Sequence, residues 1–207
     1  RQLQRQLQEL NIIYTIGRSV TSLLDLNHIL HRVVDAAVYL ADAEEGMLLL
    51  LDPAEGELYL RAAKNVDEKV GRTLRVRVDD SVAGRVIQTG RPVFLSGERA
   101  KVITGYLVKA LLYIPLRAPD RGVIGVLGVI NRREEQTFSE RDIFLFSALA
   151  DYAAIAIENA RLFEALECER AKLETILREA QEAIIVVDEK NHVLLCNTGA
   201  AKAFDLV

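Results

Sequence analysis

Few side chains in this sequence are suited to chemistry by their type and spacing. His28 and His31 lie one helical turn apart, a spacing that can bind a metal ion, but neither a cysteine nor a third histidine accompanies them. Cys168 and Cys196 have no neighbour at a metal-binding spacing, and His192 falls in a predicted turn. Nucleophilic catalysis would need a serine or cysteine with a base within reach. The sequence has no such pattern, so we expect neither a metal site nor catalytic activity.

The composition limits the partners and the compartment. The chain has 207 residues and a net charge of −4 without a basic patch, which argues against nucleic-acid binding. No apolar run reaches the roughly 18 residues typical of a membrane span, so we expect none. Two cysteines do not make a disulfide framework, which favours the reducing cytoplasm. The chain does not begin with methionine, and we expect it to be a piece of a longer protein.

Heptad spacing predicts long helices on both sides of a central domain. Residues 1–24 carry Leu3, Leu7 and Leu10 at steps of four and three, and residues 25–41 form a second helix with one apolar face. A third helix is predicted from Ser139 to about residue 181, because Ser139 is a good N-cap and neither proline nor glycine follows. Its apolar positions also step by three and four residues.

A helix with charges around one narrow apolar seam needs a partner helix. A second stripe from Phe146 to Ala160 runs along the first half of the third helix and should pack on the strands. We expect the seam to join two copies in a parallel homodimer with a four-helix bundle. The alternative is an internal helix of one large core. The predicted interface consists of Leu3, Leu7, Leu10, Leu145, Tyr152, Ile155, Leu162, Leu166, Leu173 and Ile176.

Apolar and alternating runs between the helices predict a sheet. A short helix is expected at residues 79–90, and residues 97–108 show no period and should form an irregular loop. Gly122, Gly125 and Gly128 recur at every third position, which we interpret as close approach by a packed helix or loop. Strands are expected at residues 46–51, 57–63, 72–78, 91–96, 110–116 and 122–131.

Several of these segments, taken in order, resemble a known family. The strand GVIGVLGVIN (122–131), the helix start FSERD (138–142) and the helix AIAIENARL (154–162) are similar to the GAF domain of bacterial and plant signalling proteins. The resemblance covers about residues 25–166. It implies an α+β fold with a central antiparallel sheet of about six strands flanked by helices. It also implies a small-molecule pocket between the sheet and the loops, of which residues 97–108 could form the lid.

The end of the chain resembles a second family. Residues 182–207, EAIIVVDEKNHVLLCNTGAAKAFDLV, are similar to the start of a PAS domain, a hairpin followed by a helix. Since an isolated hairpin is marginal in water, we expect this one to be buried against the dimer mate or a neighbouring molecule. The expected organisation is an N-terminal coiled-coil helix (1–24), a GAF domain (25–166), a signalling helix (167–181) and a truncated PAS domain (182–207).

The GAF resemblance also bears on cofactors. Some GAF domains attach a bilin pigment through a cysteine and a few are redox enzymes with pocket cysteines, but residues 1–167 contain no cysteine. Haem would need an axial ligand, and no histidine is available in the pocket. We therefore expect no covalent bilin and no haem, and no other cofactor is identifiable. The expected ligand-binding residues are Tyr59, Phe94, Ser96, Thr104, Tyr106 and Tyr113.

One motif bears on the ligand. Cyclic-nucleotide-binding GAF domains carry Asn-Lys, a spacer, then Phe, three residues and Asp-Glu. Here Asn131 is followed by Arg132, so that Arg replaces the Lys of the pattern. After Phe138 and three further residues come Asp142 and Ile143, so that Ile replaces the Glu. The structural interpretation is that Asn131 ends a strand, Phe138 anchors the start of the helix and Asp142 serves its first turn.

We therefore expect a cytoplasmic, non-catalytic sensory and dimerisation module of a signalling protein such as a histidine kinase. In this hypothesis the GAF domain responds to a small ligand or a protein contact, and the long helix relays the change to the PAS domain. Two alternatives stay open. One is a structural dimerisation module whose pocket is filled by Tyr59, Phe94, Tyr106 and Tyr113. The other is a cyclic-nucleotide-binding GAF domain.

Overall fold

The computed structural model describes residues 26–67, 74–79, 81–101, 107–132, 138–180 and 182–205, and side chains are described outside residues 97–101 and 107. The predicted helix at residues 1–24, with Leu3, Leu7 and Leu10, lies outside this part of the chain. The chain forms two compact units, Arg1–Asn159 and Ala160–Val207.

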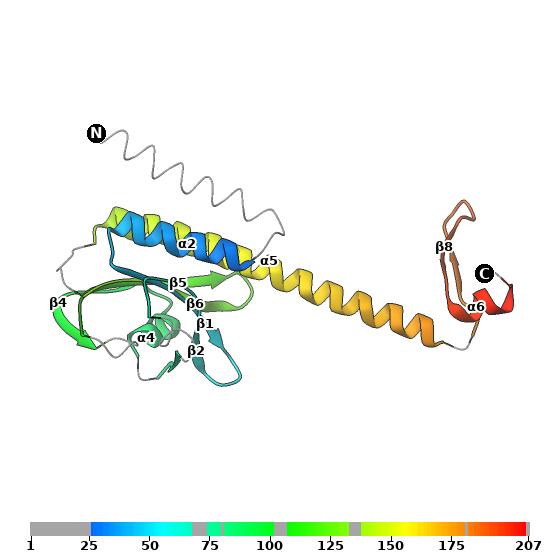
Figure 1. Ribbon diagram of the computed structural model, residues 1–207, viewed down its shortest axis with the longest axis horizontal. Helices are drawn as coiled ribbons and strands as arrows, with labels where there is room; N and C mark the ends of the chain where they lie inside the picture. Colours follow the sequence, from blue (N-terminus) through cyan, green and yellow to red (C-terminus); the bar gives the residue numbers. More distant parts are fainter. Residues whose placement is uncertain are drawn as a thin grey trace. The chain divides into compact units, whose positions relative to one another are not determined.

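A six-stranded antiparallel sheet forms the centre of the first unit (Figure 1). The strand order is β3-β2-β1-β6-β5-β4, so β1 and β6 are neighbours at its centre although they are distant in sequence. Both are buried over most of their length, as expected for strands covered on two sides. The predicted α+β fold with a central antiparallel sheet is confirmed. The strands are β1 (Glu45–Asp52), β2 (Glu57–Lys64), β3 (Arg75–Arg77), β4 (Val93–Lys101), β5 (Leu107–Ala118) and β6 (Gly122–Asn131).

Two helices cover one face of this sheet (Figure 1). They are α2 (Leu26–Ala41) and the first part of α5 (Glu140–Glu179), which buries the predicted stripe that begins with Phe146. Both pack on side chains from alternate positions of the strands, such as Leu48 and Leu50 of β1. This face therefore holds the larger of the two apolar cores.

The short helix α4 (Val82–Thr89) covers the opposite face. Met47 and Leu49 of β1 point to this side and share a core with Ala83 and Val86 of α4. Because β1 supplies residues to both cores in turn, its unbroken apolar run is explained by burial on two faces.

Polar side chains determine where the helices begin. At α4, the hydroxyl of Ser81 accepts a hydrogen bond from the backbone nitrogen of Gly84 at 2.9 Å, and Gly90 ends the helix in the left-handed region at φ 63°. At α5, the backbone nitrogen of Ser139 donates to the carboxylate of Asp142 at 2.8 Å. The backbone nitrogen of Asp142 donates back to the Ser139 hydroxyl at 3.2 Å. This reciprocal pair is a capping box, so the predicted N-cap at Ser139 is confirmed.

The irregular loop predicted at residues 97–108 is wrong in part. β4 continues to Lys101 and β5 begins at Leu107, while residues 102–106 lie outside the described chain. The register of the β4–β5 pair shifts between Ser96 and Ala100. Regular strand pairing is therefore interrupted within β4, and the prediction of a loop missed that the strand continues beyond this point.

One glycine of β6 makes room for an aromatic ring. Gly128 pairs with Tyr113 of β5 on one side and with Met47 of β1 on the other. A Cβ atom at Gly128 would lie 2.3 Å from Cε1 of Tyr113, so the ring crosses over β6 at this point. The Tyr113 hydroxyl donates to the sulfur of Met47 at 3.9 Å. Close approach by a helix or loop was the wrong interpretation of Gly128, because a side chain of the same sheet fills the space.

The second unit contains the distal part of α5, a hairpin and a short helix. The hairpin consists of β7 (Ile185–Val187) and β8 (Val193–Cys196), and α6 (Thr198–Ala203) follows it. This order of strand, turn, strand and helix is the one expected for residues 182–207.

The buried side chain of Asn197 connects these elements. Its Oδ1 atom accepts hydrogen bonds from the backbone nitrogens of Ile184 and Ala200, at 2.8 and 2.9 Å. Its Nδ2 atom donates to the carbonyl oxygens of Leu177 and Glu182, at 3.1 and 2.8 Å. One amide therefore joins the last turn of α5, the residue that precedes β7 and the N-terminus of α6.

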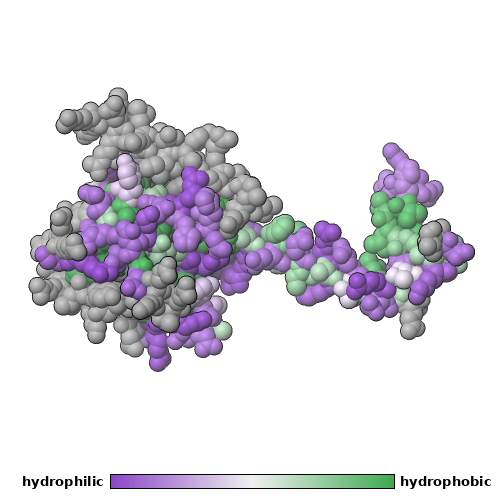
Figure 2. Space-filling view, in the orientation of Figure 1, coloured by the Kyte–Doolittle hydropathy of each residue, from purple (hydrophilic) through white to green (hydrophobic). Residues whose placement is uncertain are grey.

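Both strands of the hairpin carry exposed apolar side chains, which gather on β7 and β8 in Figure 2. The described part of the chain does not cover them, so the burial of this hairpin against a dimer mate stays a prediction. The exposed residues are Ile185, Val186, Val187, Val193 and Leu194.

The predicted seam of α5 is exposed along most of its length. Leu145 and Tyr152 are half-buried, and Tyr152 packs beside Ile29 and Ala156. The other five seam residues are between 48% and 66% exposed, and they are Ile155, Leu162, Leu166, Leu173 and Ile176.

By length and composition alone, α5 is also the one described helix that is long and apolar enough to cross a membrane. Core helices of soluble proteins can be equally long and apolar, and part of the apolar stretch of α5 is buried within the protein. That this chain has no membrane span stays a prediction.

Replacing Gly128 by alanine is expected to lower the free energy of unfolding by about 1–3 kcal/mol, because the added methyl group overlaps a fully buried ring. Urea unfolding followed by circular dichroism measures the change. In a Tyr113→Leu background the ring is absent, and replacing Gly128 by alanine should lower the free energy of unfolding by a smaller amount. An equal loss in both backgrounds would show that the ring is not what excludes a side chain at this position.

Candidate functional site

The aromatic residues predicted to line a pocket lie on opposite faces of the sheet. Tyr113 is fully buried on the α4 side, whereas Tyr59 packs on the side of α2 and α5. The reason is strand alternation, since Leu58 and Leu60, which flank Tyr59 in β2, take the α4 side. The sequence had led us to expect Tyr59 and Tyr113 in one pocket. The structure places them on opposite faces of the sheet instead.

The other four predicted residues belong to β4 or follow it. Phe94 is 55% exposed, and Ser96 is half-buried. Thr104 and Tyr106 lie outside the described residues. Apolar side chains surround Tyr113 on the α4 side, and Tyr113 is the one described residue of the four proposed pocket fillers that belongs to this cluster.

A polar recess opens where β1 begins and where β2 and β6 end. Its volume is about 650 Å³, within the range of roughly 300–1,000 Å³ that small-molecule sites occupy. We call it the β1 recess. The described residues that line it are Asp42, Ala43, Glu44, Glu45, Asn65, Asn131 and Arg132.

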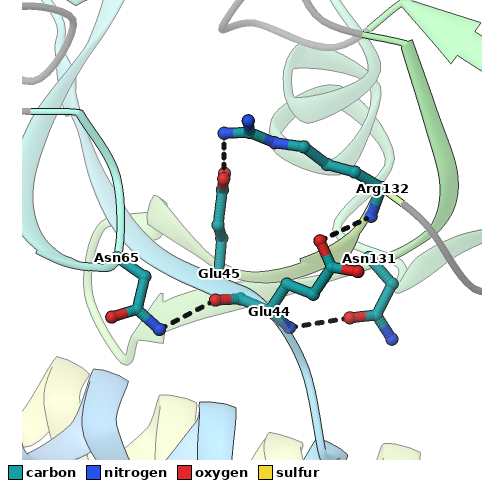
Figure 3. Close-up of polar contacts among 5 residues, drawn as sticks. All are labelled: Glu44, Glu45, Asn65, Asn131 and Arg132. Carbon is teal, nitrogen blue, oxygen red and sulfur yellow. Dashed lines mark hydrogen bonds and ion pairs between the residues drawn. The ribbon is translucent and has the colours of Figure 1, made fainter.

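Two asparagine side chains, one after the end of β2 and one at the end of β6, contact the backbone of Glu44 (Figure 3). The backbone nitrogen of Glu44 donates to Oδ1 of Asn131 at 2.7 Å, and its carbonyl oxygen accepts from Nδ2 of Asn65 at 2.9 Å. The Glu44 carboxylate accepts from the backbone nitrogen of Arg132 at 3.4 Å. These contacts hold the start of β1 against the ends of β2 and β6.

Glu45 and Arg132 form an ion pair on the α4 side of the sheet (Figure 3). Glu45 is 5% exposed, and Arg132 reaches its Oε1 atom through Nη2. The other carboxylate oxygen, Oε2, is buried, and no group of the described chain donates a hydrogen bond to it. Buried polar atoms are nearly always paired, and among the described residues this oxygen lacks a donor.

The electrostatics of the recess extend to Tyr113. Burial raises the pKa of Glu45 above its usual range, although Arg132 favours the ionised form and so opposes the rise. Burial also raises the pKa of Tyr113, and the negative charge of Glu45 adds to that rise. Glu45 is therefore close enough to Tyr113 to affect the pKa of its hydroxyl.

Sequence reasoning missed Glu44, Glu45 and Asn65. A signal was present in the stretch EEGMLLLL (44–51), where two carboxylates directly precede a strand that must be buried on both faces. A charged residue in such a strand requires a partner. The identity of that partner, Arg132, depends on strand pairing that the sequence does not display.

The residues of the partial cyclic-nucleotide motif make contacts within the protein. Asn131 bonds the backbone of Glu44, and Asp142 belongs to the capping box of α5. Phe138 packs on the core under α2 and α5. These contacts agree with the structural interpretation of the motif.

The candidate metal ligands of the sequence stay apart. His28 and His31 are both exposed on α2. His192 is exposed in the β7–β8 turn, where its Nδ1 atom lies 3.0 Å from Oδ2 of Asp188. Within the described ranges, no three histidine, cysteine or carboxylate side chains are grouped closely enough to hold a metal ion.

Comparison with known proteins identifies the family. The family model described as GAF domain matches residues 25–159, about two thirds of the chain. The chain belongs to the GAF domain family. GAF domains are sensory and regulatory modules, and an isolated one is generally not catalytic, so a regulatory function follows for this domain.

Curated relatives include large enzymes. The dual 3',5'-cyclic-AMP and -GMP phosphodiesterase 11 of Drosophila melanogaster is 27% identical over 194 residues, which cover 84% of this chain and 13% of that protein. The probable 3',5'-cyclic phosphodiesterase pde-5 of Caenorhabditis elegans is 25% identical over 208 residues, 91% of this chain and 28% of that protein. This chain therefore spans only a minor part of these relatives.

Solved structures share the GAF fold. The GAF domain of an Acinetobacter phosphoenolpyruvate-protein phosphotransferase superimposes with a TM-score of 0.66 at 21% identity, over 75% of this chain and 95% of that one. The GAF domain of a putative sensor histidine kinase from Pseudomonas syringae pv. tomato gives 0.61 at 24% identity, over 82% and 97%. These similarities confirm the expected GAF-like fold.

The raised pKa of Glu45 predicts a specific pH dependence of stability. A carboxyl with a higher pKa in the folded than in the unfolded state binds more protons when folded, so its contribution to the free energy of unfolding falls as the pH rises from about 4.5 through the raised value. Glu45→Gln lacks this contribution. The stability of the wild type relative to Glu45→Gln should therefore fall as the pH rises through this window.

Urea unfolding of both proteins between about pH 4 and pH 8 measures this difference. Glu55→Gln, in the exposed β1–β2 turn, is the matched control and should follow the wild type. A constant difference between the wild type and Glu45→Gln would mean that the pKa of Glu45 is not raised by folding.

Proposed function

We propose that this chain is a non-catalytic sensory and dimerisation module of a signalling protein, with the β1 recess as the ligand site of its GAF domain. The observation that carries the proposal is the position of the recess at the connection between α2 and β1. Asp42 and Ala43 line the recess, and their backbone nitrogens close the end of α2 by donating to the carbonyl oxygens of Tyr39 and Val38. A ligand that contacts this connection acts directly on the end of α2.

The contact between α2 and α5 supports a relay. Ile29 of α2 and Ala156 of α5 share a buried cluster with Leu26 and Tyr152. A ligand that favours one position of α2 would therefore bias the position of α5, which continues as one helix to Glu179. In this proposal the last turn of α5 passes the change to the hairpin through Asn197.

Further parts of the proposal concern the parent protein. We propose that residues 182–207 begin a PAS domain, since a hairpin and a helix follow α5 in the expected order. A cytoplasmic two-component system with a histidine kinase output fits this order of modules. The fold similarity to the GAF domain of a putative sensor histidine kinase supports the same context.

A cyclic nucleotide is the second candidate ligand. The curated relatives favour it, because those enzymes are named as cyclic-nucleotide phosphodiesterases. The partial motif at Asn131 and Asp142 also favours it. One observation argues against a cyclic nucleotide: Arg132, the one cation among the described residues that line the recess, is already paired with Glu45.

Native mass spectrometry combined with hydrogen exchange tests the sensing proposal. The purified chain should retain a small molecule, and its removal should raise amide exchange at residues 38–46, where α2 ends and β1 begins. Cyclic GMP and cyclic AMP are then added to the ligand-free chain, and protection of the same segment would favour the second candidate. A chain that retains nothing and shows unchanged exchange would instead be a structural dimerisation module.

The seam of α5 predicts a second result. Glutamates at Leu166 and Leu173 should convert a dimer into a monomer, because they place charges on an exposed apolar stripe that we assign to the dimer interface. Multi-angle light scattering measures the mass. The matched control, glutamates at the exposed off-seam positions Ala165 and Ala171, should stay dimeric. If the variant with both seam glutamates is still dimeric, this stripe is not the dimer interface.

A further inference from the structure

Building on the proposed ligand site, we infer that the β1 recess binds a small organic cation, with an amidinium, guanidinium or ammonium group donating hydrogen bonds to the carboxylate of Glu45. The inference rests on the burial of that carboxylate, on the atom it leaves without a donor and on the balance of charge around the recess.

The first step is the missing donor. Glu45 is 5% exposed and lines the recess, and its Oε1 atom is taken by Arg132. Its Oε2 atom is also buried and receives no hydrogen bond from the described residues. Arg132 favours the ionised form of this carboxyl, although burial has the larger effect and raises the pKa of Glu45, and a second cation beside Oε2 would favour the ionised form further. A ligand N–H group in the recess would complete its coordination.

The second step is the charge of the recess. Its described lining contains the carboxylates of Asp42, Glu44 and Glu45 and one cation, Arg132. An anionic ligand would meet this excess of negative charge, whereas a cation reduces it. Arg132 is also already paired with Glu45, so an anion would have to compete for it. Charge therefore favours a cationic ligand over a phosphate or a carboxylate.

The third step distinguishes an organic cation from a metal ion. No described group of three metal-ligating side chains is present, so the three carboxylates do not converge on one point. A metal ion needs several oxygen ligands at short distance. A planar amidinium or guanidinium needs only one well-placed carboxylate and can satisfy its other N–H groups with neighbouring carbonyls or water. The volume of about 650 Å³ accommodates such a molecule.

Isothermal titration calorimetry with probes of one shape and three charges tests the inference. Benzamidine is the cation, benzamide the neutral analogue and benzoate the anion. Methylguanidine and ethylamine extend the series to other cationic groups. The full chain, freed of any retained ligand, should bind at least one cation with Kd below about 1 mM and should bind it more tightly than benzamide and benzoate.

Variants locate the binding. Glu45→Gln keeps the size of the side chain but loses the charge, and it should weaken cation binding by about tenfold or more. Arg132→Gln removes the cation that competes for the Glu45 carboxylate and should make cation binding tighter, so it tests the inference even if Glu45→Gln does not fold. Glu55→Gln lies at the opposite end of β1 and should bind as the wild type does.

The outcomes separate this inference from the proposed function. Cation binding that survives Glu45→Gln, or a preference for benzoate, would overturn the inference and leave a sensory GAF domain with a different ligand. A retained neutral or anionic molecule in native mass spectra would do the same. If no probe binds and the purified chain retains nothing, both the inference and the ligand-sensing function fail.

Discussion

β1 pairs with β2 along one edge and with β6 along the other, and this double pairing decides which side of the sheet the neighbouring side chains occupy. Met47 and Leu49 enter the core under α4, while Leu48 and Leu50 enter the core under α2 and α5. A shift of register by one residue would exchange the contents of the two cores, so the register is strongly specified. The packing of Tyr113 over Gly128 depends on the same register.

The same constraint creates the recess. Glu45 precedes Met47 by two positions, so alternation directs its carboxylate to the α4 side, where it is buried. A buried charge needs a partner, and β6 ends beside β1 so that Arg132 can supply one. The polar ends of β1, β2 and β6 therefore meet at one end of an otherwise apolar sheet. The position of the proposed ligand site is therefore set by the register of the strands and by the polar residues at their ends.

α5 has two different environments along one uninterrupted helix. Its first part carries a stripe that the sheet buries, and it packs beside α2. From Ile155 onward its seam is exposed. One stripe anchors the helix on the sheet, and the other is exposed and available to a partner. Such a helix is suited to connect ligand binding at the GAF domain with dimerisation. The amide of Asn197 gives the far end of this helix a defined attachment within the second unit.

Much of the architecture could be predicted from the sequence, because it depends on local patterns. Alternation and apolar runs indicated the strands, and Ser139 with Asp142 indicated the start of α5. Wherever a local pattern was interrupted, the prediction failed. The continuation of β4 beyond the register shift between Ser96 and Ala100 was not predicted. Gly128 was assigned to the wrong neighbour, since the ring that fills its space belongs to another strand.

The candidate site was the part that the sequence did not determine. Tyr59 and Tyr113 were expected in one pocket, but the pairing of their strands places them on opposite faces. Glu45 and Arg132 are 87 positions apart, and only the antiparallel pairing of β1 with β6 brings them together. The sequence alone determined most of the elements, the caps of α4 and α5 and the resemblance to the family, since these follow from neighbouring residues. The tertiary structure alone decided which charges meet, because that depends on the register between strands distant in sequence.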